Sequence, residues 1–360
     1  MIGTQHSSQR ARFSSSLGRR AVLLVLYTLL GLVALCGCRS HQTSSGESAP
    51  AVTNLSWPSP PDTARIALQR IVYRPADLGV HYSALARVGR WLTGSEKGNE
   101  RLIKPFSIAL DEGGNLCVTD TGAKTVCFYD RQQKRWRSWN KLGPVSLRSP
   151  VAVTKHDGKL YVADSALGQV LVADISGKLL LRIGKPLARP VGLAISGEQL
   201  FVTDSLLHKV MVFDLQGNMR KEFGARGKNG GEFNFPTHIA TDAQGDLFVT
   251  DSMNNRIQIF SPNGAFKGQI GSAGDGPGCF SRPKGVAVDT LGHVYVVDSN
   301  FDNIQIFDRQ GQLLLTVGQS GSNAGEFWLA NGIAISPQNE IFVADAYNHR
   351  IQIFKYVGPS

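Results

Sequence analysis

The stretch PKGVAVDTLGHVYVVDSNFDNIQIFDRQGQLLLTVG, residues 283–318, contains one complete structural unit of this chain. It opens with the apolar run 283–289 and, after a turn, continues as the β-branched run 293–298. Residues 303–308 alternate apolar and polar side chains, as a half-buried strand does, and 313–318 form a further apolar run. The stretch therefore predicts four consecutive antiparallel strands.

The unit recurs along the chain and is marked by six copies of Val-x-Asp. The aspartates of these copies are Asp120, Asp164, Asp204, Asp251, Asp298 and Asp345, at intervals of 44, 40, 47, 47 and 47 residues. A repeat of this length is typical of one four-stranded propeller blade. The sequence therefore predicts an all-β protein, a six-bladed β-propeller of four-stranded antiparallel blades.

The expected outer strands end in glycine after only five of the six hairpins, at Gly143, Gly184, Gly224, Gly271 and Gly318. The last hairpin, which ends with 350–354, has no such strand after it, whereas residues 85–89 (LARVG) have its pattern. We therefore expect 85–89 to pair with 350–354 and close the ring. A closed ring leaves only short sheet edges, which favours a monomer.

The series Pro-x-Gly-Val-Ala-Val-Asp, Val-x-Asp-Ser-x-Asn-x-Arg-Ile-Gln-Ile-Phe and a glycine-rich loop ending in Gly-Glu-Phe resembles the NHL repeat. The resemblance is best at 251–260 and 345–354 and extends over about 85–356. It implies the same six-bladed fold and leaves the activity open. The first three blades depart from the pattern: Ser107 and Ala152 replace the glycine after proline in the first two, and the second and third lack the Gly-Glu-Phe loop.

The amino-terminal residues resemble a bacterial lipoprotein signal. Four arginines precede residues 21–35, which carry no charge, and Gly37 is a suitable small residue before a lipid-modified Cys38. Three alternatives remain open. Residues 21–38 could be an uncleaved anchor, although a span needs about 20 apolar residues; Arg19-Arg20 could belong to a twin-arginine signal; or the start site could be placed too early.

These patterns predict four segments: a signal peptide at 1–37, a flexible tether rich in Ser, Thr, Pro and Gly at 38–61, a leader at 62–84 and the propeller at 85–360. The leader resembles that of bacterial NHL-repeat lipoproteins and is expected to pack on the ring. No aspartate, a common signal for inner-membrane retention, follows Cys38, so the resemblance implies a lipid anchor in the cell envelope, in the outer membrane rather than the inner one.

Composition agrees with an exported globular domain. Hydrophobic residues make up 42% of 360, and the formal charge of +10 falls to +6 without the four arginines of the signal. No Lys/Arg block is present, so we expect the excess on a solvated face and no nucleic-acid partner. Cys117 and Cys127 could form a cross-strand disulfide or lie on opposite faces of their sheet, and Cys279 would stay single.

The six repeated aspartates are interpreted as structural anchors, because each ends a strand before a tight loop where a carboxylate can accept backbone N–H bonds. Asp298→Ala is expected to cost about 1 to 3 kcal/mol through unsatisfied donors. Arg256 and Arg350 follow their aspartates by five residues and are expected to pair with them.

His238 replaces a glycine at the start of an innermost strand and is a candidate ligand or metal residue near the axis, together with His208 and His349 in matched loops. No ligand pair with recognised metal spacing is present, so no metal, cofactor or catalytic residue is assigned, and a divalent cation in the channel stays an alternative.

Two functions remain. The favoured one is a non-catalytic binding or scaffold module for a protein or cell-surface polymer, and aromatic residues expected at the surface support it: Trp91, Trp136, Trp139 and Trp328. The alternative is a metal-dependent hydrolase or lyase with its site in the central channel. An enzyme would gather at least three convergent polar ligands at the channel mouth.

Overall fold

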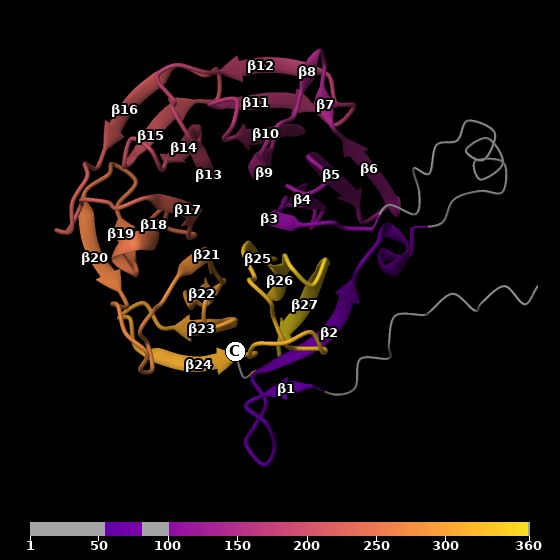
Figure 1. Cartoon of the computed structure of the whole chain (residues 1–360), viewed down its shortest axis with the longest axis vertical. Helices are drawn as coiled ribbons and strands as arrows, with labels where there is room; N and C mark the ends of the chain where they lie inside the picture. Colours follow the sequence, from indigo (N-terminus) through magenta and orange to yellow (C-terminus); the bar gives the residue numbers. More distant parts are fainter. Residues whose placement is uncertain (1–54, 81–100, 359–360) are drawn as a thin grey trace, which may run out of the picture. The chain divides into compact units, whose positions relative to one another are not determined.

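The computed structural model describes residues 55–80 and 101–358, which form six β-sheets arranged as blades around a central axis (Figure 1). The predicted fold class, an all-β six-bladed propeller of four-stranded antiparallel blades, is confirmed. In the described ranges the only helical elements are two 3-10 turns, η1 (Pro75–Leu78) and η2 (Ser252–Asn254).

Five blades follow one another along the chain, each with its first strand innermost. Blade 1 consists of β3 (Pro105–Leu110), β4 (Leu116–Asp120), β5 (Thr125–Asp130) and β6 (Arg135–Trp139). Blade 2 consists of β9 (Pro150–His156), β10 (Lys159–Asp164), β11 (Gln169–Asp174) and β12 (Leu179–Ile183), and is preceded by the small hairpin β7 (Lys141–Leu142) and β8 (Val145–Ser146). Blade 3 consists of β13 (Pro190–Ser196), β14 (Gln199–Asp204), β15 (Lys209–Asp214) and β16 (Met219–Phe223). Blade 4 consists of β17 (Pro236–Thr241), β18 (Leu247–Asp251), β19 (Arg256–Phe260) and β20 (Phe266–Ile270). Blade 5 consists of β21 (Pro283–Val288), β22 (Val294–Asp298), β23 (Asn303–Phe307) and β24 (Leu313–Val317).

Blade 6 joins the two ends of the described chain. Its inner strands are β25 (Ile333–Ile335), β26 (Glu340–Asp345) and β27 (Arg350–Tyr356), and β2 (Ile66–Val72) pairs antiparallel with β27, with β1 (Ser56–Trp57) beyond it. Figure 1 shows the indigo β2 beside the yellow β27. An amino-terminal strand therefore closes the ring, as expected.

The expectation that residues 85–89 form this closing strand is wrong. The free edge of β27 is taken by β2, which belongs to the predicted leader, and β1 lies at the end of the predicted tether. The reason is burial: Ile66, Leu68, Ile71 and Val72 are each at most 5% exposed, so this segment places four apolar side chains against blade 6 and its neighbours. Residues 85–89 themselves lie outside the described residues.

The core is divided among the spaces between neighbouring blades. Cys127 packs with Leu116 and Ile351 between blades 6 and 1, whereas Cys117 packs with Val162 between blades 1 and 2. The two cysteines are one register step apart on β4 and β5, so their side chains lie on opposite faces of the sheet and no disulfide joins them. Burial raises the pKa of the Cys117 thiol.

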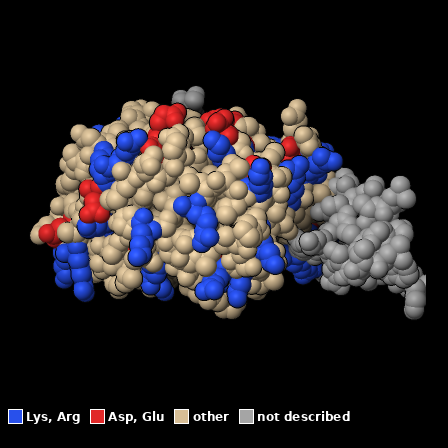
Figure 2. All heavy atoms as spheres, turned by 90° about the horizontal axis from the view of Figure 1, so that it is seen from above, with Lys and Arg blue, Asp and Glu red and all other residues tan. Residues whose placement is uncertain are grey.

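The ring has two faces with different surface charge. We call the face formed by the loops between the second and third strand of each blade the loop face, and the opposite face, with the tight turns, the turn face. Exposed basic residues of the loop face are Arg101, Lys124, Lys141, Arg148, Lys185, Arg189, Arg226, Lys228 and Arg282, and its fully exposed acidic residue among the described positions is Asp275. Exposed acidic residues in turns of the turn face include Glu112, Asp157 and Glu198. The side view in Figure 2 shows most of the acidic side chains toward the upper edge of the ring, whereas basic side chains are spread over the whole view.

Candidate functional site

The six repeated aspartates connect segments of the loop face by hydrogen bonds. Asp298, fully buried, accepts hydrogen bonds from the backbone N–H groups of Ser281, Arg282, Asn300 and Phe301, at 2.7 to 3.2 Å. Each carboxylate thus joins its own loop to the segment that leads into the innermost strand. The same type of contact is made by Asp120, Asp164, Asp204, Asp251 and Asp345.

Two blades use an arginine in this network. The Arg350 Nε donates to Asp345 at 2.7 Å, and its other nitrogens donate to the carbonyl oxygens of Ser322, Asn323 and Glu326. The corresponding bond from Arg256 to Asp251 is 2.9 Å. Burial raises the pKa of Asp345, and the hydrogen bond from the Trp328 amide and the charge of Arg350 oppose this shift. These arginines are therefore occupied within the protein.

His208 and His349 lie in left-handed backbone conformation at the end of their loops, with φ of 57° and 56°. The Phe235 amide donates to Nδ1 of His208 at 3.1 Å, and Nδ1 of His349 donates to the Ile103 carbonyl. Both contacts link one blade to the next. Burial, with a contribution from nearby Arg226, lowers the pKa of His208.

Other blades fill the same loop position with residues that make the same kind of link. The Asn255 side chain donates to the Ser281 carbonyl, and the Asp302 carboxylate accepts from the Leu329 amide. Histidine, asparagine and aspartate are the residue types, besides glycine, that most often adopt a positive φ. His208 and His349 therefore act as inter-blade links. Asn255 and Asp302, which stand at the same loop position in other repeats, could have indicated this role.

The central axis holds a cavity of about 320 Å³ that reaches from the turn face to the level of His238. Its walls come from the innermost strands of all six blades: β3, β9, β13, β17, β21 and β25. Since each of these is the edge strand of its sheet, free backbone groups face the axis. At the mouth, the Lys155 ammonium and the Asp111 carboxylate form an ion pair at 2.5 Å, and Glu112 and His156 lie beside them.

Close packing of the innermost strands narrows the axis at the level of His238. A Cβ added at Gly192 would lie 2.3 Å from the Thr237 carbonyl oxygen, and one at Gly332 would lie 2.5 Å from that of Phe106. Glycine is needed where neighbouring backbones approach this closely. The equivalent positions in blades 1 and 2 carry the small residues Ser107 and Ala152.

His238 fills the axis at this level. Its ring stacks on Phe106, from the opposite blade, with centroids 6.3 Å apart. Both ring nitrogens are buried and have no hydrogen-bond partner within the protein, although part of the side chain borders the cavity. Burial, together with the charge of Lys284, lowers the pKa of His238 to about 3; Asn331 lies close enough to oppose this shift without hydrogen-bond geometry. The imidazole is therefore neutral at neutral pH.

The three candidate histidines do not come together. His238 lies on the axis, whereas His208 and His349 lie in loops of blades 3 and 6. Within residues 55–80 and 101–358 there is no group of three or more His, Cys, Asp or Glu side chains that could hold a metal ion. The charged neighbour of His238 is a cation, Lys284, which disfavours a divalent metal at this position.

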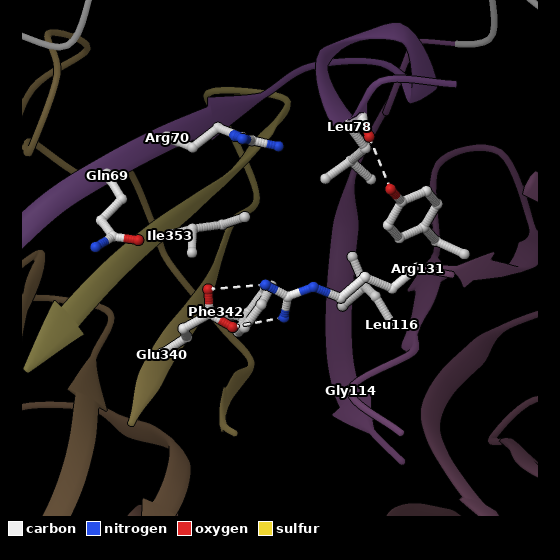
Figure 3. A pocket seen from close by; sticks show the side chains of 10 residues that line it. Gln69, Arg70, Leu78, Gly114, Leu116, Arg131, Glu340, Phe342 and Ile353 are labelled. Atoms are coloured by element: carbon white, nitrogen blue, oxygen red, sulfur yellow. Dashed lines mark hydrogen bonds and ion pairs between the residues drawn. The ribbon is translucent and has the colours of Figure 1, made fainter. Parts of the chain in front are cut away.

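A second cavity, of about 380 Å³, lies where the closing strand meets blades 1 and 6 (Figure 3). Leu78, Leu116, Phe342 and Ile353 provide apolar walls, and Gln69, Arg70, Arg131 and Glu340 provide polar ones. Arg131 and Glu340 form a two-bond ion pair of 2.6 and 3.2 Å, and the Tyr129 hydroxyl donates to the Leu78 carbonyl at 2.7 Å. The ion pair joins blade 1 to blade 6, and the tyrosine hydrogen bond joins blade 1 to the segment after β2.

The loop face carries an aromatic patch where blade 6 meets blade 1, defined by Ile103, Lys104, Trp328 and Tyr347. Ile103, Trp328 and Tyr347 are 51%, 52% and 40% exposed, and the two aromatic rings lie 5.7 Å apart. The Lys104 ammonium lies 4.3 Å from the centre of the Tyr347 ring. We call these four residues the aromatic patch.

Of the four tryptophans expected at the surface, Trp328 is exposed. Trp136 and Trp139 are half-buried on β6, where the Trp139 indole donates to the Ser176 carbonyl at 3.2 Å. Trp91 lies outside the described residues. Further exposed apolar residues of the loop face, Leu206 (54%) and Met253 (60%), were not recognised from the sequence, because a loop position does not show which side chain faces solvent.

Comparison with known proteins agrees with this architecture. The NHL repeat family matches residues 280–307 and 327–354, and a family described as a 6-bladed beta-propeller matches 242–293. Among curated protein sequences, none matches significantly. The chain therefore contains NHL repeats within a six-bladed β-propeller.

Solved structures resemble the chain in fold. A streptogramin B lyase is 14% identical, with a TM-score of 0.52, over 71% of this chain and 94% of that one. A hydrazine synthase chain from Kuenenia stuttgartiensis is 13% identical, with a TM-score of 0.53, over 71% and 96%. A protein of unknown function from Bacteroides thetaiotaomicron is 18% identical, with a TM-score of 0.54, over 71% and 70%. At these identities the likeness concerns the fold alone.

Proposed function

We propose that this six-bladed NHL-repeat propeller is a non-catalytic binding module, anchored by lipid at Cys38 in the bacterial outer membrane, that holds a protein or cell-surface polymer on its loop face. The aromatic patch is the observation that carries the proposal. Trp and Tyr are among the residue types that contribute most to the binding energy at protein interfaces.

The surroundings of the patch support this use. The loop face combines several exposed apolar side chains with nine exposed basic ones, and large exposed apolar groups on a folded domain mark interaction sites. The anchors bond every loop to the segment that leads into its blade, and the inter-blade links bond four of the loops to the backbone of the next blade. A rigid surface loses little conformational entropy on binding.

The alternative of a metal-dependent hydrolase or lyase has less support. The histidine expected near the axis, His238, lies close to the cation Lys284, and of the two acidic residues at the mouth, Asp111 is already paired with Lys155. The anchoring part of the proposal rests on the predicted signal at 1–37, which lies outside the described residues. Within the described ranges, no helix is long and apolar enough to cross a membrane.

Photocrosslinking in whole cells tests the binding function. A benzophenone amino acid at position 328 should give one discrete adduct, whereas the same group at Leu314, an exposed position on the outer strand β24, should not. An excess of purified wild-type protein should abolish the adduct, and an excess of the Tyr347→Ser variant should not. Equal adducts from both positions would contradict the proposed surface.

Labelling cells with an alkyne fatty acid tests the anchor separately. The wild-type chain should carry the label and float with outer-membrane vesicles, and Cys38→Ala should lose both properties. Cys36→Ala is the matched control and should retain them. Label on Cys38→Ala, or its absence from the wild type, would refute the lipid anchor without affecting the binding proposal.

A further inference from the structure

An unusual group of polar atoms lies beside the point where the axial cavity reaches His238. Thr237 Oγ1, both ring nitrogens of His238 and Asn331 Oδ1 are all buried and have no hydrogen-bond partner within the protein. Buried polar atoms are nearly always hydrogen-bonded, and four orphans in one place require an explanation. They come from blades 4 and 6, on either side of Lys284 in blade 5. We call Thr237, His238, Lys284 and Asn331 the axial cluster.

The charge of the axial cluster is positive. Lys284 forms no ion pair with any residue that the structure describes, and burial lowers its pKa to about 8, with a further lowering by Arg282. The one carboxylate that acts on it noticeably, Asp298, is already bound by four backbone N–H groups. The cluster itself contains no acidic residue. A cation held away from water without a counter-ion is a favourable place for an anion.

The other members can all donate hydrogen bonds toward such an anion. Neutral imidazole keeps one N–H, the threonine hydroxyl has one O–H, and the amide of Asn331 supplies two N–H groups on its other terminal atom. Charge-assisted hydrogen bonds from several donors are the usual way in which proteins hold a carboxylate. The cluster therefore fits an anion better than it fits a metal ion or an apolar group.

The cavity leading to the cluster limits what can enter. Its volume of about 320 Å³ lies at the lower end of the range for small-molecule sites. The edge strands that line it present free backbone N–H and C=O groups, which suit a ligand with hydroxyl groups. The cavity opens on the turn face beside the pair of Lys155 and Asp111 and reaches His238 at its inner end, so a ligand can enter from the turn face.

We propose that the axial cluster binds the carboxylate of a small hydroxy acid that enters through the turn-face mouth. Lys284 and the donors of Thr237, His238 and Asn331 hold the carboxylate, and the free strand edges hold the hydroxyl groups. This site lies on the axis, away from the aromatic patch, and does not depend on the function proposed for the loop face.

Thermal unfolding with sodium lactate as the probe tests the proposal, since a ligand that binds the folded state raises Tm with its concentration. At constant sodium concentration, lactate should raise the Tm to a saturating value, whereas lactamide, its neutral analogue, and sodium chloride should not. Lys284→Met should weaken the apparent affinity at least tenfold. His156→Gln, at the mouth of the same cavity, is the control and should leave the affinity within twofold.

If Lys284→Met does not fold, a crystal structure of the wild-type protein, from crystals grown with lactate, tests the proposal. Density for lactate with its carboxylate within hydrogen-bond distance of the axial cluster supports the proposal. Ordered water alone at the cluster would overturn it. Equal stabilisation by lactate, lactamide and chloride, or unchanged affinity in a folded Lys284→Met variant, would also overturn it.

Discussion

Removing one anchor carboxylate tests how the blades are held together. Asp298 has no solvent exposure, and its two oxygens accept from the backbone N–H groups of Ser281 and Arg282 on one side and Asn300 and Phe301 on the other. Asp298→Ala leaves all four donors without their acceptor. It also separates the loop of blade 5 from the segment that leads into its innermost strand.

The expected loss follows from these contacts. A hydrogen bond to a charged group contributes about 1.5 to 3 kcal/mol, and the contributions of neighbouring bonds are not additive. Because the four donors are only partly buried, water will satisfy some of them after the substitution. We therefore expect a loss of about 3 kcal/mol, at the upper end of the estimate from sequence. For a chain of this size that corresponds to a fall in Tm of roughly 6 °C.

Differential scanning calorimetry of residues 55–360 measures the change. Asp298→Asn keeps the volume of the side chain and one acceptor oxygen, and should lose about half as much, which separates lost hydrogen bonds from a packing defect. Asp308→Ala is the control in the same blade: its carboxylate accepts one backbone N–H, that of Gln312, at 2.8 Å. This control should cost less than about 1 kcal/mol.

A melting temperature of Asp298→Ala equal to that of Asp308→Ala would refute the reasoning. It would mean that the loop N–H groups find equivalent partners in water and that the carboxylate adds nothing to the blade. The free energy of unfolding could also fall equally for Asp298→Asn and Asp308→Ala but much more for Asp298→Ala. That result would assign the effect to the space left by the missing side chain and contradict the hydrogen-bond account.

Three further predictions concern other parts of the ring. Ile71→Asp places a charge at a position that is 2% exposed and should release the closing strand, seen as rapid trypsin cleavage at the amino-terminal side of the ring, whereas the exposed Gln69→Asp should not. Arg350→Met leaves the buried Asp345 carboxylate unpaired and should cost about 3 to 5 kcal/mol in urea unfolding; no change would contradict the pairing. The pKa of His238 is lowered to about 3 in the folded state. The unfolded state therefore binds the extra proton between pH 6.5 and 3, and wild-type stability should fall with decreasing pH through this window by up to ~1.4 kcal/mol per pH unit more than that of His238→Gln.

The repeat was sufficient to predict the architecture. Six Val-x-Asp copies at nearly constant spacing predicted the number of blades and their four strands, because alternation of buried and exposed residues is a local property of each strand. The position of the anchor aspartates at strand ends was also visible. Of the two stretches where the NHL pattern was clearest, 345–354 lies within a family match, at 327–354, whereas 251–260 precedes the other match at 280–307.

The closing strand could not be identified in the same way. Both 66–72 and 85–89 have a plausible strand pattern, and pairing between the two ends of a chain depends on which segment buries more apolar surface against the last blade. Ile66, Leu68 and Ile71 make that contact, and the sequence does not show the surface on which they pack.

The axial cluster was only partly visible. The sequence indicated His238 because it replaces a glycine. The residues at the same position of the other blades are not its polar partners. Thr237, Lys284 and Asn331 stand one place earlier in their repeats than that position, where the comparison between repeats did not indicate a partner.

The sequence by itself determined the number of blades, their strands and the anchors, since these follow from periodic burial and from turn chemistry within each repeat. Tertiary structure alone decided which segment closes the ring, that Cys117 and Cys127 lie on opposite faces of their sheet, and which polar groups meet on the axis. The physical reason is that these features depend on strand register and on how closely six sheets pack around one axis, and neither can be read from a single repeat.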